Sequence, residues 1–172
     1  MAVRTLRLES DPLLRKISKP VREMTPRIND LIDDMMETMA AEEGVGLAAP
    51  QVGVLRRIFI TLVEDVVTVF INPEILSEDG RTYEVEGCLS LPGQCGIVRR
   101  PETLRIRALD REMKPFEVTL SGFAARVFCH ENDHLNGVLY KDRAIIMNDD
   151  VYDLTDEGEL EHYLEACYEK DL

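Results

Sequence analysis

The chain has 172 residues, a formal net charge of −13 and a pI near 4.7, with 45% hydrophobic and 31% charged residues. The composition is that of a globular protein with a core of its own, and the negative charge excludes general binding to phosphate backbones. No apolar run is long enough for a membrane span or a secretory signal. Four cysteines without a CxxC pair fit a reducing cytoplasm. We therefore expect residues 1–172 to form one cytoplasmic domain.

The first part of the chain predicts two helices that begin with proline in the first turn. Residues 10–12 (Ser-Asp-Pro) start a short helix that ends before Pro20, and residues 25–26 (Thr-Pro) start a second one. Apolar residues recur every three or four positions over residues 28–39, which predicts a long amphipathic helix ended by Gly44. The methionines on its apolar stripe are expected to pack in the core.

The middle of the chain predicts strands. Residues 57–63 and 66–72 are rich in β-branched side chains and are joined near Glu64-Asp65. Residues 103–109 alternate apolar and polar side chains, and residues 116–120 form their hairpin partner across a charged turn. These strands lie between the predicted helices, which indicates an α+β fold.

Two helices follow the strands. Residues 123–136, closed by Gly137, form the central helix around which antiparallel or mixed strands pack, and residues 157–169 form the last helix. With the helix near the N-terminus, the fold has helices at both ends. Residues 148–172 are expected to form an acidic helical tail, because positions 149–172 hold ten acids and one lysine, a formal charge of −9.

The segment of residues 130–134, His-Glu-Asn-Asp-His, is the strongest chemical signal. Side chains at i and i+4 lie on one face of a helix, so both imidazoles can reach one metal ion with Glu131 beside its water. Two surface histidines on a polar helix are the alternative. The apolar neighbours Val127, Phe128 and Leu135 favour a half-buried segment instead, and the chain has three histidines in all. The pattern predicts a metal site.

A catalytic site of this kind needs a third protein ligand and one open position. The residues leave two ways to complete it. One is Cys88 within residues 86–90, because a thiolate is a strong ligand for transition metals, although a buried apolar cysteine is common. The other is a ligand from the last helix, as in HExxH peptidases, where the candidates are Glu157, Glu159, Glu161 and His162.

Three segments together resemble the signature of the peptide deformylase family. They are GVGLAAPQ at 44–51, EGCLS at 86–90 and HENDH at 130–134, in the family's order GxGLAAxQ, EGCLS and HExDH. The similarity extends from about residue 13 to residue 140. It implies a single deformylase-like catalytic domain, a metal-dependent hydrolase. Such an enzyme removes the N-terminal formyl group from formyl-methionyl nascent polypeptides and releases formate.

The resemblance also assigns roles to the chemical groups. It implies that Cys88, His130 and His134 bind one divalent metal ion, ferrous iron in the cell, which zinc, nickel or cobalt can replace. Glu131 then takes a proton from water and delivers it to the departing amine. The oxyanion that forms accepts hydrogen bonds from the Gln51 side chain and from the backbone N–H of Leu89.

Further positions follow from the resemblance. Gly46 and Gly87 would pair with the substrate main chain, and apolar side chains would line a methionine pocket, although plain core packing is the alternative for them. The implied substrate-binding residues are Val45, Gly46, Gly87, Leu91, Phe123 and Val127. Asp133 and Arg100 would brace the site from behind the ligands.

Two positions and the tail depart from the family pattern. Cys95 stands where some members have arginine near the far end of the substrate, which puts contacts beyond the first substrate residues in doubt. Cys129 stands where glutamine is common, and we expect it to be an oxidisable thiol rather than a ligand. The acidic tail predicts no ribosome binding through residues 155–172.

Two other functions are compatible with the motif. One is a zinc peptidase of the HExxH type with its third ligand in the C-terminal helix. The other is a non-catalytic binding module stabilised by metal, which would need neither Glu131 nor Gln51. Of the three, the deformylase uses the most of the observed residues. Its expected partners are N-formylmethionyl peptides of nascent chains, with no direct nucleic-acid or membrane binding, and the chain is expected to be a monomer.

Overall fold

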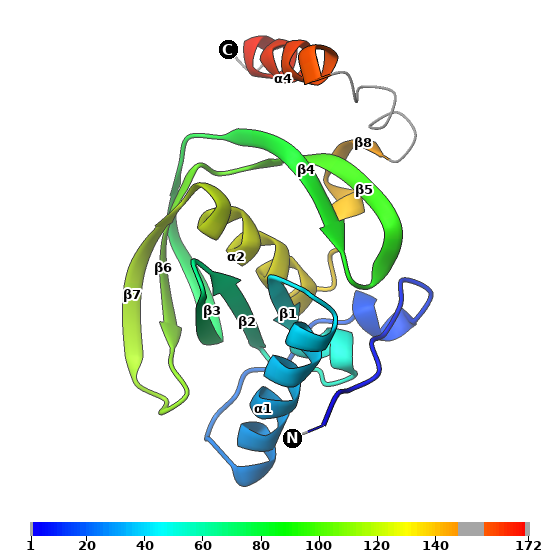
Figure 1. Cartoon of the computed structure of the whole chain (residues 1–172). Coiled ribbons are helices and arrows are strands. Elements are labelled where there is room, and N and C mark those ends of the chain that lie inside the picture. The colour runs from blue at the N-terminus through cyan, green and yellow to red at the C-terminus, as the bar shows by residue number, and fades with distance from the viewer. Residues whose placement is uncertain (1, 148–156, 171–172) are drawn as a thin grey trace.

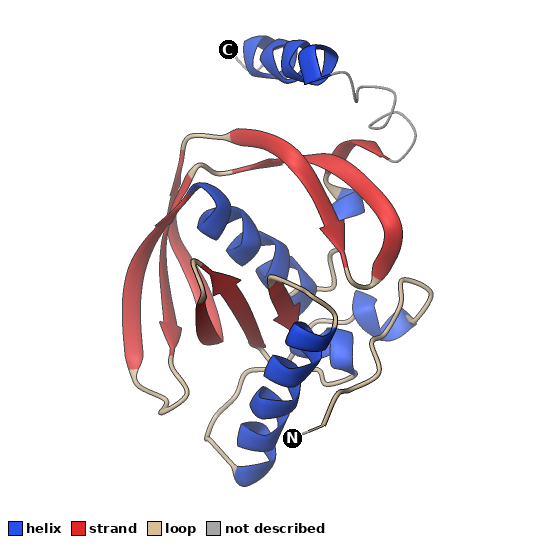
Figure 2. Cartoon of the chain, viewed as in Figure 1, coloured by secondary structure: helices blue, strands red, loops and turns tan. Residues whose placement is uncertain are grey.

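The computed structural model describes residues 2–147 and 157–170, which form two antiparallel sheets with a long helix between them (Figure 1). The described helices are η1 (Pro12–Arg15), α1 (Pro26–Ala41), η2 (Ala49–Val52), α2 (Gly122–Leu135), η3 (Tyr140–Asp142) and α4 (Glu157–Lys170). The strands are β1 (Gly46–Ala48), β2 (Ile58–Val63), β3 (Val66–Asp79), β4 (Thr82–Cys88), β5 (Leu91–Arg100), β6 (Thr103–Leu109), β7 (Pro115–Ser121) and β8 (Ala144–Met147). The predicted α+β class with antiparallel strands is confirmed (Figure 2).

The larger sheet has the strand order β1-β2-β3-β6-β7, and the smaller one has the order β4-β5-β8. The β2–β3 hairpin turns at Glu64 and Asp65, which both have left-handed backbones with φ of 51° and 62°. The predicted strand ended at Asn72, but β3 continues to Asp79. The strand passes through an irregularity there, because Asn72 is left-handed and its side chain bonds both main-chain groups of Val21 at 2.8 and 2.7 Å.

Helix α1 begins at the predicted proline, and the Thr25 hydroxyl accepts a hydrogen bond from the Ile28 N–H at 3.3 Å. The helix ends at Ala41, and Glu43 rather than Gly44 adopts the left-handed conformation after it. Its apolar stripe packs in one buried cluster with β1 and β2. The first predicted helix is a single 3-10 turn, η1, capped by Asp11.

Helix α2 is held on the larger sheet by aromatic rings. Phe128 packs edge-on against Phe59 and Phe70, with ring centroids 5.1 and 5.2 Å apart. This cluster buries one face of α2 against β2 and β3. The opposite face of the helix therefore turns toward β4 and β5, as Figure 1 shows.

The last described helix, α4, lies against the smaller sheet. The Tyr168 ring meets Tyr83 of β4 edge-on at 4.8 Å, and the Tyr168 hydroxyl accepts a hydrogen bond from the Tyr83 N–H at 3.1 Å. Tyr163, Leu164 and Cys167 join the same apolar cluster. Within the described residues, no helix combines the length and the apolar character needed to cross a membrane.

Candidate metal centre and active site

Helix α2 presents His130 and His134 on its face toward β4. The two imidazole rings are 5.1 Å apart and nearly perpendicular, as expected for positions one helical turn apart. His134 is buried, and the His130 ring stacks at 5.9 Å on Tyr140, which follows the helix. Burial lowers the pKa of His134 well below its usual value, which favours the neutral form that can bind a metal.

Cys88, at the end of β4, completes a compact group with the two histidines. Cys88 Sγ lies 3.3 Å from His134 Nε2, and the ligand atoms of all three residues lie within 4.8 Å of one another. In the part of the chain that the structure describes, this is the set of cysteine, histidine and carboxylate groups close enough to share one ion. The thiol therefore meets the imidazoles, although the three residues come from distant parts of the sequence.

The alternative ligands in the last helix do not join this group. Glu161 and His162 of α4 are exposed to solvent, and neither belongs to the cluster. The side chains of Glu157 and Glu159 lie outside the described residues.

The cluster has the chemistry of a metal site. One sulfur and two imidazole nitrogens suit a borderline or soft transition metal. His130 Nδ1 lies 3.0 Å from Glu86 Oε2, which leaves its Nε2 as the nitrogen on the side of Cys88, and His134 directs Nε2 toward the sulfur. His134 Nδ1 and Glu131 Oε2 are both buried without a protein partner, as expected where a site also holds water or an ion.

Glu86 lies behind His130 and contacts three charged or polar side chains of the site. Its carboxylate receives two hydrogen bonds from Arg100 at 2.8 and 2.9 Å and one from Arg126 at 2.8 Å, besides its contact with His130. Burial would raise the pKa of Glu86, but the bonds from Arg100 and His130 outweigh burial and lower it to about 2. Glu86 is therefore ionised at neutral pH and fixes the orientation of the His130 ring.

Asp133 extends this network behind the ligands. Arg100 donates to Asp133 at 2.6 Å, and Arg143 donates to both Asp133 oxygens at 2.7 and 2.8 Å. The predicted pair of Asp133 and Arg100 is thus in direct contact and buried. Arg100 bridges Asp133 to Glu86, so one guanidinium connects the neighbour of His134 to the partner of His130.

The Gln51 amide is held in one orientation beside the thiol. Its Oε1 accepts a hydrogen bond from the Ala48 N–H at 2.9 Å, so its Nε2 faces Ser90 Oγ at 3.1 Å and Cys88 Sγ at 3.5 Å. Leu89 lies between Cys88 and Ser90 and lines the same cavity. The structure therefore gathers both predicted oxyanion donors, Gln51 and Leu89, around the cluster.

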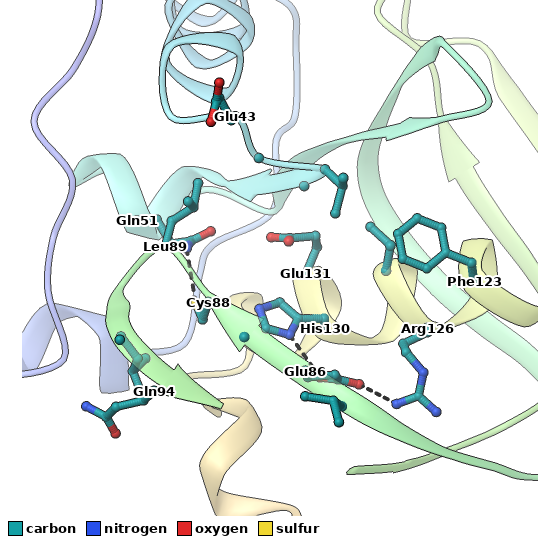
Figure 3. Close-up of a pocket in the computed structure, with 18 residues that line it drawn as sticks. Glu43, Gln51, Glu86, Cys88, Leu89, Gln94, Phe123, Arg126, His130 and Glu131 are labelled. Carbon is teal, nitrogen blue, oxygen red and sulfur yellow. Dashed lines mark hydrogen bonds and ion pairs between the residues drawn. The ribbon is translucent and has the colours of Figure 1, made fainter. Parts of the chain in front are cut away.

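Glu131 faces the cavity from α2, opposite Gly46. A Cβ atom on Gly46 would lie 2.8 Å from Glu131 Cδ, closer than two carbons can approach, so a larger residue there would displace the Glu131 side chain. Burial raises the pKa of Glu131 to about 7. The carboxylate lies at the edge of the metal cluster, with backbone of β1 across from it (Figure 3).

A cavity of about 420 Å³ opens above these groups (Figure 3). All six predicted substrate-binding positions line it: Val45, Gly46, Gly87, Leu91, Phe123 and Val127. Val45 and Phe123 are 45% and 52% exposed, so both present apolar surface at the border of the cavity. Figure 3 shows Phe123 at one end of the cavity and Gln94 at the other.

Several residues of the site were not predicted from the sequence. They are Glu86, Ser90, Arg126, Tyr140 and Arg143, which contact the ligands or their partners. Glu86 could have been found, because it precedes Cys88 by two positions on a strand and so faces the same side. The others depend on contacts between distant segments, which one sequence does not reveal.

Comparison with known proteins gives consistent matches. The family model described as polypeptide deformylase matches residues 3–149. A peptide deformylase of Lachnoclostridium phytofermentans is 50% identical over 164 residues, which are 94% of this chain and 99% of the relative. The crystal structure of peptide deformylase from Thermotoga maritima has a TM-score of 0.83 at 41% identity, covering 85% of this chain and 100% of that one. A structure from Acinetobacter baumannii, a class I type b peptide deformylase bound to Met-Ala-Ser, has a TM-score of 0.80 at 33% identity, covering 83% and 98%.

Proposed function

Because this chain belongs to the peptide deformylase family, whose members are metal-dependent hydrolases that remove the N-terminal formyl group from nascent polypeptides, we propose that Cys88, His130 and His134 bind the metal and that Glu131 moves the proton. The chain is an enzyme that hydrolyses formyl-methionyl amides. The observation that carries our assignment is the approach of one thiol and two imidazoles within 4.8 Å. Helix α2 is the central element of this proposal.

The ion in this site is a divalent transition metal, and we assign ferrous iron as the native one, with zinc, nickel or cobalt as substitutes. The support is the resemblance of the three motifs and the mixed sulfur and nitrogen donors, which several of these metals accept. When bound, such an ion supplies Lewis acidity, which polarises a carbonyl group and makes water a stronger nucleophile near neutral pH.

The protein groups carry the remaining chemistry. Glu131 accepts the proton of the attacking water and delivers it to the amine, which leaves an amide readily only once protonated. The Gln51 amide and the Leu89 N–H donate hydrogen bonds to the oxygen that becomes negative. Phe123, Val127 and Val45 give the methionine side chain an apolar wall, and Gly46 and Gly87 border the cleft at the open edges of β1 and β4.

The direct test is formate release from N-formyl-Met-Ala by protein that is purified without oxygen and analysed for metal. We expect turnover in proportion to bound metal, and loss of turnover after chelation. Absence of formate from a fully metal-loaded sample contradicts the proposal.

Gln51→Ala is expected to lower kcat by roughly 100- to 1,000-fold, the usual cost of one oxyanion donor. The fold should survive, because the 3-10 turn keeps its backbone hydrogen bonds from Gly53 and Val54, although the Ala48 N–H loses the Gln51 side chain as its acceptor. Steady-state kinetics of formate release measures the effect. A kcat for Gln51→Ala within tenfold of that of the original enzyme would show that Gln51 does not donate to the oxyanion.

Glu86→Gln is expected to weaken metal binding by roughly 10- to 100-fold, the usual cost of losing a partner of a ligating histidine. The amide keeps the size of the carboxylate but removes the negative charge that Arg100 and Arg126 share. Competition with a metal chelator measures the affinity. Glu84→Gln is the matched control, since Glu84 is half exposed and forms an ion pair with Arg126 among the described residues. Equal losses of metal affinity in both variants contradict a special role of Glu86.

For the remainder of the molecule we propose a cytoplasmic monomer whose residues 1–172 act as one domain and do not bind nucleic acid directly. The support is the charge of −13 and the acidic tail. Co-sedimentation with ribosomes tests this for residues 155–172. We expect the same weak recovery for the full chain and for a variant ending at residue 154, and recovery that depends on the tail would overturn this view.

A further inference from the structure

One wall of the substrate cavity separates it from a second hollow. The wall is the start of β5, where Leu91 and Gln94 line the cavity on one side. The same two residues line an open hollow of about 450 Å³ on the other side. The remaining residues around this hollow are Leu8, Glu9, Ser10 and Ser90. The position of Gln94 therefore depends on contacts made across the second hollow.

Glu9 makes those contacts. Gln94 Nε2 donates a hydrogen bond to Glu9 Oε2 at 3.3 Å, and Lys141 Nζ forms an ion pair with Glu9 Oε1. The Glu9 N–H donates to the Ser90 carbonyl at 2.9 Å, so the backbone of the N-terminal segment is fixed to the same loop. Glu9 thus joins the N-terminal segment, the cavity wall and η3.

The contact with Glu9 determines which atom of the Gln94 amide is available to hydrogen-bond a ligand. An ionised carboxylate accepts hydrogen bonds and cannot donate them, so the amide nitrogen must face Glu9. None of the hydrogen bonds among the described residues uses Gln94 Oε1. The carbonyl oxygen is left without a partner among the described residues, and a peptide main chain offers matching N–H donors.

The location of Gln94 suits the part of a substrate that follows the methionine. Figure 3 shows Gln94 and Phe123 at opposite ends of the cavity, with Cys88 and His130 between them. If the methionine side chain occupies the Phe123 end, the next residues can pass along the wall at Gln94. This step rests on the proposed function.

We propose that Gln94 and Glu9 form a specificity-determining pair for the residues after methionine, in which Gln94 Oε1 accepts a main-chain N–H of the substrate. Glu9 is the positioning residue, because it acts through Gln94. One hydrogen bond contributes about 0.5–1.5 kcal/mol, which corresponds to roughly two- to tenfold in KM. The decrease in KM should appear only for peptides long enough to reach Gln94.

The test is the dependence of kcat/KM on peptide length for the metal-loaded enzyme. The substrates are N-formyl-Met-Ala, N-formyl-Met-Ala-Ser and N-formyl-Met-Ala-Ser-Ala. We expect the longer peptides to be better substrates by about three- to tenfold, through KM. Gln94→Leu and Glu9→Ala should each remove most of this ratio, while Glu9→Gln, whose amide can donate as well as accept and so no longer fixes the orientation of Gln94, should restore it only in part.

Two comparisons keep the result decisive. Glu23→Ala, at an exposed carboxylate that lines neither hollow, should leave the length ratio unchanged. Glu9→Ala should add nothing in a Gln94→Leu background, because the two residues act on one bond. A length ratio that is absent in the original enzyme, or that survives in Gln94→Leu, overturns the inference. Failure to hydrolyse even the dipeptide would instead count against the proposed function.

Discussion

Glu131→Ala is expected to retain its metal and to lose nearly all turnover. The three ligand atoms belong to Cys88, His130 and His134, so removing Glu131 leaves the metal cluster complete. The variant lacks the only carboxylate that lines the cavity from α2, and with it both proton transfers. A positioned acid or base usually contributes roughly 100- to 10,000-fold, and Glu131 serves in both steps, so we expect kcat to fall by roughly 1,000-fold or more.

Formate release and metal content are measured on the same sample of this variant. Glu42→Ala is the matched control, because Glu42 is an exposed carboxylate outside the cavity, and it should behave as the original enzyme. A Glu131→Ala variant that retains a tenth of the activity, or one that loses its metal, contradicts the role we assign.

Cys88→Ser is expected to lose both metal and activity. A serine hydroxyl is a harder and weaker ligand than a thiolate for iron, zinc, nickel and cobalt. The affinity should therefore fall by more than the roughly 10- to 100-fold that changes around the ligands cause. The substitution also separates the two enzyme classes that the motif allows, since a peptidase with its third ligand in the last helix would be unaffected.

Metal affinity by competition, followed by activity at saturating metal, measures this effect. Cys95→Ser is the matched control: Cys95 lies opposite Gly87 on β5 and packs in the apolar cluster with Tyr83, away from the ligands. It should keep metal binding and turnover. Equal behaviour of the two serine variants would exclude Cys88 from the metal site.

Local patterns in the sequence predicted the regular elements well. Helix α1, the β6–β7 hairpin and α2 all repeat apolar residues at the period of their own structure, and their observed limits lie within a few residues of the predicted ones. The β4–β5 hairpin lacks such a pattern, because glycine and proline lie within its strands on either side of the turn, and one of its faces is covered by α4. The place of this hairpin in the fold depends on contacts between residues that are distant in the sequence.

The residues of the site also divide into those that a local pattern predicts and those that only the tertiary structure reveals. The spacing of His130 and His134 requires only a helix, so the residues alone suggested it. Cys88 remained one of two alternatives until the tertiary structure placed its thiol beside the imidazoles. The arginine network around Glu86 was not predicted, since buried ion pairs form between segments that the sequence does not connect.

Cys129 shows where a prediction from residue type was wrong. It was expected to be an oxidisable thiol, but it is buried in the aromatic cluster beneath α2. Burial raises the pKa of this thiol to about 12, so the reactive thiolate is not formed at neutral pH. Position relative to the core, rather than the residue type, decides its chemistry.

X-ray absorption at the metal edge of the loaded, oxygen-free protein tests the metal assignment most directly, because it reports the atoms bound to the ion itself. For the zinc-loaded protein we predict one ion per chain with one sulfur neighbour at about 2.3 Å and two imidazole nitrogens at about 2.0–2.1 Å. The sulfur signal should disappear in Cys88→Ser and persist in Cys95→Ser. A first shell without sulfur in the original protein would contradict the assignment.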